Sequence, residues 1–63
     1  MSSTPLPSHV IELLEGALDV LEARLDAVHV QPSPRALELL LRAADAVLEA
    51  GRAVVRAARG EAP

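Results

Sequence analysis

The sequence predicts an all-α fold, an antiparallel two-helix hairpin that dimerises into a four-helix bundle. Residues 8–29 and 34–59 both carry apolar residues at alternating steps of three and four, which is the spacing of one helix face. The turn at 30–33 is short, so the two helices are expected to be antiparallel neighbours. A chain of 63 residues without cysteine has no disulfide to stabilise it, so oligomerisation is the expected stabiliser.

Residues 1–7 are expected to form a flexible, Pro-rich arm. Their sequence, MSSTPLP, is too short and too polar for a signal peptide, and Pro5 and Pro7 disfavour an early helix start. Ser8 is then expected to cap the first helix with its hydroxyl. The helical hairpin is predicted to extend over residues 8–60, and residues 61–63 are expected to fray.

The first helix, 8–29, carries one apolar row and one acidic row. The apolar row is its predicted half of the hairpin core: Ile11, Leu14, Leu18, Leu21, Leu25 and Val28. The acidic row, here called the acidic ridge, consists of Glu12, Glu15, Asp19, Glu22 and Asp26. Catalysis or cation binding would need carboxylates that converge from several elements. We therefore expect the ridge to be solvated or to face arginines of another helix.

The second helix, 34–59, is predicted to begin after Ser33, a good capping residue, with Pro34 at the first helical position. Its half of the hairpin core is predicted to be Leu37, Leu40, Ala44, Val47, Gly51 and Val54. A glycine inside a helix costs about 1 kcal/mol relative to alanine, so Gly51 is expected to permit the close approach of another backbone. Gly60 is expected to end the helix in the left-handed conformation.

A second apolar row on the same helix is made mostly of alanine. This Ala row consists of Leu39, Ala43, Ala46, Ala50, Ala53 and Ala57. Alanine is the best helix former, and helix propensity alone is one explanation of the row. However, this helix is polar on only about a third of its circumference, which is typical of a helix with more than one neighbour. We therefore interpret the Ala row as the oligomer interface.

Charge and composition favour a protein partner. The net charge is −3 and there are no aromatic residues, so the chain lacks both the basic surface and the stacking residues that nucleic acid requires. No apolar run approaches the roughly 18 residues of a membrane span. We expect a cytoplasmic homo-oligomer, with a dimer favoured and a protein hetero-partner as the alternative, and we expect neither nucleic acid nor membrane as a partner.

The sequence predicts no enzyme activity, no cofactor and no metal. Its serines and single threonine lie in the arm and the turn, where none has a base and a third group beside it, and there is no Gly-rich phosphate loop. His9 and His29 lie at opposite ends of the first helix. Asp26 and His29 form half of a ferritin-like metal motif, but the inward-facing glutamate of that motif is missing.

Leu13 to Val54, with LLEGALDVLEARLDA, a turn and SPRALELLLRAADAVLEA, resembles the last two helices of the phosphotransfer domain of CheA-family histidine kinases. The family's Ser-Pro cap and LLRAxDAL-like run correspond to Ser33, Pro34, Leu40, Leu41, Arg42, Ala43, Ala44, Asp45 and Val47. The family's phosphoryl acceptor is a His followed by x-x-Lys-Gly, whereas His9 is followed by VIE and the chain has no lysine. The resemblance therefore implies half of a bundle that acts in bacterial signalling by pairing with itself or with another protein.

Two further resemblances define alternative functions. The hairpin is similar to the Rop-type regulators of plasmid copy number, dimeric four-helix bundles that bind RNA, although the acidic balance here disfavours RNA. It is also similar to the helical docking and dimerisation elements of modular polyketide synthases, which are megasynthases. The leading hypothesis remains a non-enzymatic helical-hairpin interaction module that homo-oligomerises.

Overall fold

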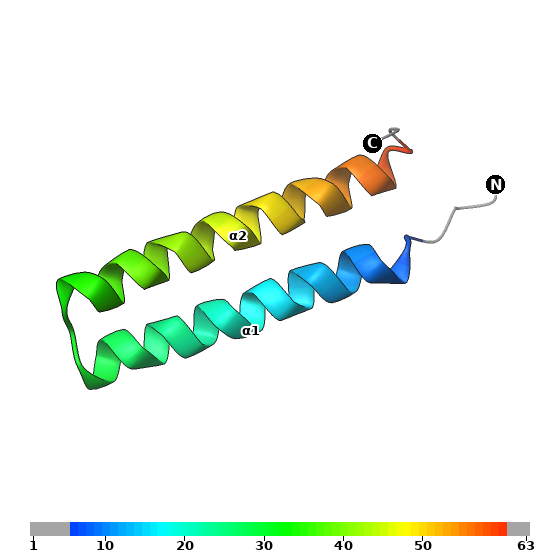
Figure 1. The fold of residues 1–63 in the computed structure, drawn as a ribbon. Coiled ribbons are helices and arrows are strands. Elements are labelled where there is room, and N and C mark those ends of the chain that lie inside the picture. The colour runs from blue at the N-terminus through cyan, green and yellow to red at the C-terminus, as the bar shows by residue number, and fades with distance from the viewer. Residues whose placement is uncertain (1–5, 61–63) are drawn as a thin grey trace.

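Two antiparallel α-helices make up the part of the chain that the structure, a computed structural model, describes, which is residues 6–60. They are α1 (Ser8–Val30) and α2 (Pro34–Ala58), and no strand occurs in this part. The helices lie side by side, so that the start of α1 and the end of α2 share one end of the hairpin (Figure 1). This confirms the predicted all-α hairpin. The predicted tail, and the predicted arm up to residue 5, lie outside the described residues.

The prediction that Ser8 caps α1 is wrong. Pro7 occupies the capping position, with φ −58° and ψ 132°, and no side chain caps this end. The Pro7 carbonyl accepts a hydrogen bond from the Val10 N–H at 3.1 Å. The ring of Pro7 fixes φ, and with this extended ψ the residue already has the backbone conformation that precedes a helix. Ser8 is therefore the first helical residue.

The local signals at both ends of α2 are confirmed. Ser33 is extended, and its Oγ accepts a hydrogen bond from the Ala36 N–H at 3.0 Å, with Pro34 next in the chain. This bond satisfies one of the N–H groups that the first turn of a helix leaves without a partner. At the other end Gly60 has φ 73° and donates its N–H to the Ala57 carbonyl at 3.1 Å. Glycine adopts this left-handed conformation without steric cost.

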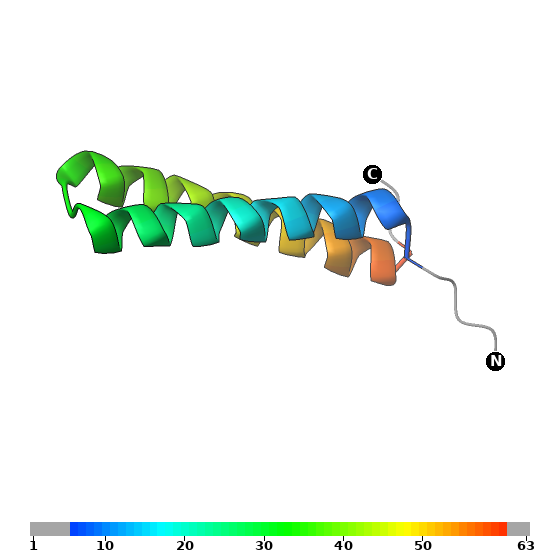
Figure 2. The same cartoon turned by 90° about the horizontal axis from the view of Figure 1, so that it is seen from below.

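The contact between the helices buries few side chains. Among residues 6–60 only Val10 and Ala43, which are 8% and 5% exposed, are buried. On α2 a row at steps of four and three is buried or half-buried: Ala36, Leu40, Ala43, Val47, Ala50, Val54 and Ala57. On α1 the covered residues are Val10, Ile11, Leu14, Ala17, Leu21 and Val28. Figure 2 shows the helices crossing obliquely along their length. The covered surface of α2 is therefore centred on a seam of mostly small residues.

Candidate functional site

One side of the hairpin displays a row of large apolar side chains, here called the Leu/Val face. It consists of Leu14, Leu18 and Leu25 of α1 and Leu37, Leu41, Leu48 and Val55 of α2. All of these except the half-buried Leu14 are between 40% and 68% exposed. The four α2 members lie about 120–160° around the helix from Ala43, the most buried residue. The face is therefore apolar surface that the partner helix in the same chain does not cover.

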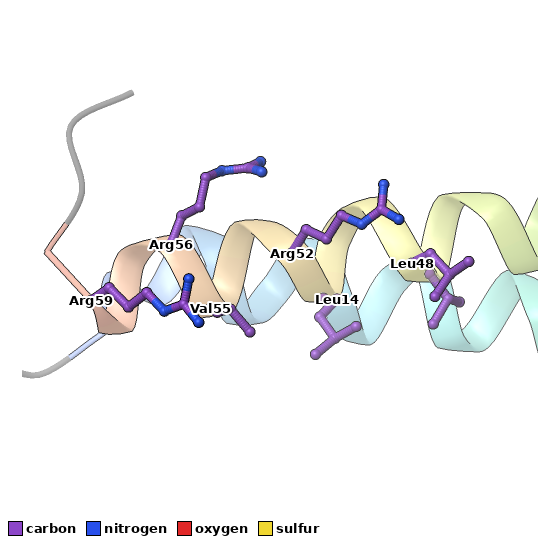
Figure 3. Close-up of a pocket in the computed structure, with 8 residues that line it drawn as sticks. Leu14, Leu48, Arg52, Val55, Arg56 and Arg59 are labelled. Atoms are coloured by element: carbon purple, nitrogen blue, oxygen red, sulfur yellow. The ribbon is translucent and has the colours of Figure 1, made fainter.

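A groove joins the two halves of this face. It has a volume of about 680 Å³ and is lined by Leu14, Val47, Leu48, Gly51, Arg52, Val55, Arg56 and Arg59. Leu14 of α1 thus faces the same space as Leu48 and Val55 of α2 (Figure 3). Leu18 and Leu25 lie within about 40° of Leu14 around α1, which places them on the same side. The apolar residues of both helices therefore form one surface.

The two edges of the Leu/Val face have opposite charge. Along α2, Arg52 and Arg59 follow Leu48 and Val55 by one turn, and Figure 3 shows the Arg52 side chain extending away from α1. Along α1 the acidic ridge borders the face, because its members Glu15 and Glu22 lie within about 60° of Leu18. The face therefore has an acidic edge on α1, and on α2 an edge that carries Arg52 and Arg59 together with Asp45, which lies about 20° from Arg52 around the helix.

Three ion pairs between described residues lie within α2. Arg42 contacts Glu38 at 2.9 Å, Arg35 contacts the same carboxylate at 3.4 Å, and Arg52 contacts Glu49 at 3.4 Å. All these side chains are at least half exposed, so the pairs contribute a few tenths of a kcal/mol each at most. Relief of the acidic ridge by Arg42, Arg52 or Arg56 of another helix stays a prediction.

The hairpin covers most of the predicted core residues only in part. Ile11, Leu14, Leu21, Val28, Leu40, Ala44, Val47, Gly51 and Val54 are half-buried, whereas Leu18, Leu25 and Leu37 are exposed. In the Ala row Ala43 is buried, Ala46 is exposed, and Leu39, Ala50, Ala53 and Ala57 are half-buried. The surface of α2 that α1 covers thus lies between the two predicted rows and takes residues from each. Contact of the Ala row with a second chain stays a prediction.

Gly51 has no close neighbour within the hairpin. A Cβ atom built there meets nothing within 4 Å, and the same holds for Gly16 of α1. The expected close approach of another backbone at Gly51 is therefore not made by α1. Gly51 lines the groove of the Leu/Val face, so it is open to an approach from outside the hairpin.

Val10 and Ala36 are not among the predicted site residues, although both belong to the contact between the helices. Val10 begins a row at steps of four and three that continues through Leu14, Ala17 and Leu21. Ala36 begins the corresponding row on α2. The same spacing as in the predicted rows, started one residue away, was the available signal.

The described residues contain neither a cluster suited to a metal ion nor a helix suited to spanning a membrane. Within residues 6–60 no three His, Asp or Glu side chains gather where they could hold a metal ion, and His9 and His29 are both exposed. Neither α1 nor α2 is long and apolar enough to cross a membrane. A second groove, of about 320 Å³, lies near the turn and is bordered by Arg24, Arg35 and Leu39 among others.

Comparison with known protein families, with curated proteins and with solved structures found no match.

Proposed function

We propose that this chain is a non-enzymatic helical-hairpin interaction module that homo-oligomerises, as a dimer that buries the Leu/Val face in a four-helix bundle. The proposal rests on the contrast between the few apolar side chains that the hairpin buries and the many large ones that it leaves exposed. Six large apolar side chains are exposed on one side, whereas the contact between the helices buries only Val10 and Ala43 among the described residues. Contiguous apolar surface of this kind marks sites of protein association.

We propose the Leu/Val face, rather than the Ala row, as the main contact between the chains. On α2 the Leu/Val face offers four large exposed side chains, whereas the exposed member of the Ala row is Ala46. On α1 the exposed large apolar residues outside the Leu/Val face are Leu13, Val20 and Val30. Burial of the Leu/Val face removes more apolar area from water, and the free energy gained scales with that area.

Size-exclusion chromatography with light-scattering and refractive-index detection tests the proposal, since the chain has no aromatic absorbance. We expect a mass of twice 6.6 kDa at a chain concentration of about 0.1 mM. A mass of 6.6 kDa throughout the micromolar and millimolar range would contradict it.

A further inference from the structure

We infer that in the assembled dimer α1 of one chain packs on α2 of the other, with the two turns at the same end of the bundle. This inference rests on the proposed function and adds the orientation of the second copy. It is carried by the opposite charges at the two edges of the Leu/Val face.

Two arrangements bring the Leu/Val faces of two copies together with two-fold symmetry. When the axis runs along the helices, each α1 lies over the partner's α2 and both turns lie at one end. When the axis runs across the helices, α1 lies over the partner's α1, α2 lies over the partner's α2, and the turns lie at opposite ends. In both arrangements neighbouring helices are antiparallel and the same apolar side chains are buried.

The charges at the two edges of the Leu/Val face distinguish between these two arrangements. The α1 edge carries only carboxylates, including Glu15 and Glu22, so two α1 helices side by side would oppose two acidic ridges. Like charges placed opposite each other are destabilising. The α2 edge carries Arg52, Arg56 and Arg59 beside the groove. With the axis along the helices, each acidic ridge lies beside α2 instead, which carries four arginines against three carboxylates, so the repulsion between two ridges is relieved.

The positions along the helices identify which charged residues would meet in this arrangement. The turn is centred on Pro32, so residues equally far from Pro32 in the two helices lie at about the same level. Glu12 and Arg52 are one such pair, and both lie on outer edges of the hairpin, far from each other within one chain. With the axis along the helices, Glu12 of one chain and Arg52 of the other lie at the same level on adjacent helices. Glu22 and Arg42 form a second such pair, whereas Asp19 meets Asp45, Glu15 meets Glu49 and Asp26 meets Glu38. The preference for this arrangement therefore rests on the net charges of the helices, −4 for α1 and +1 for α2.

Spin labels measure the orientation directly, because the chain has no cysteine and a single introduced cysteine is unique. The test variant is Gln31→Cys, an exposed residue at the turn end of α1. The matched control is Ala23→Cys, an exposed residue near the middle of α1. With the turns together, we expect the two Gln31→Cys backbones about 10–20 Å apart, one or two interhelical spacings. With the turns at opposite ends, they lie about 35 Å apart, the length of α1.

Each outcome of the distance measurement decides a different point. A short distance at Gln31→Cys supports the inferred orientation. A distance of about 35 Å at Gln31→Cys, with dipolar coupling also present at Ala23→Cys, overturns the orientation and leaves the dimer intact. Absence of dipolar coupling at both positions overturns the orientation together with the proposed self-association.

Discussion

Leu14 of α1 and Leu48 of α2 line the same groove, although they belong to different helices. Because of this relationship, the α1 and α2 members of the Leu/Val face form one continuous surface. A second copy can therefore cover both rows with a single contact.

Charge placed on the Leu/Val face should abolish association. In Leu48→Glu, assembly would bury a carboxylate without a partner, so we expect the dimer to weaken about 100-fold or more. The matched control is Ala46→Glu, which introduces the same charge at the exposed position of the Ala row. Isothermal dilution calorimetry measures both dissociation constants. If the two variants weakened the dimer equally, the Leu/Val face would not be the main interface and the Ala row would take part in it.

Gly51→Leu should separate helix stability from assembly. The site is open in the single hairpin, and leucine favours helix over glycine by close to 1 kcal/mol, so the helicity of the dilute chain should rise. Association should weaken, since the leucine occupies space that the second chain fills.

Gly16→Ala is the control for Gly51→Leu, because a Cβ there is equally open but Gly16 does not line the groove. Circular dichroism and the dissociation constant should show higher helicity with unchanged association for Gly16→Ala. Tighter association of Gly51→Leu would show that no second chain approaches Gly51.

The two serines that precede or begin the helices should differ in their contribution to stability. Ser33→Ala removes the 3.0 Å bond to the Ala36 N–H and should cost about 1 kcal/mol of the free energy of unfolding. Ser8→Ala should change stability little, because no side chain caps α1. Urea unfolding followed by circular dichroism compares them. A loss at Ser8→Ala as large as at Ser33→Ala would contradict the capping assignments.

Exchanging the charges of Glu12 and Arg52 should show that these two residues interact across the contact between the chains. Arg52→Glu and Glu12→Arg should each weaken the dimer severalfold, and the double variant should recover part of the loss. Arg52→Glu also removes the pair with Glu49, but that loss is common to the single and double variants. Additive losses in the double-mutant cycle would argue against adjacency of the Glu12 and Arg52 edges.

The features that depend on interactions between residues close in the chain could be predicted from the sequence. The helices, the Ser33 cap and the left-handed Gly60 depend on residues within a few positions of each other, and all three are present. The rotation of α2 could not be predicted in this way, because its two apolar rows are adjacent around the helix. The choice between them depends on α1, whose Leu21 lies at about the level of Ala43. Large side chains pack well opposite small ones, which favours a seam that takes alanines from one row and larger residues from the other.

Self-association is the central claim, and sedimentation equilibrium with interference optics, combined with circular dichroism over a dilution series, tests it most directly. We expect a helical dimer of twice 6.6 kDa whose helicity falls as dilution separates the chains. A monomer of 6.6 kDa, with a helical signal that does not change with concentration, would contradict self-association.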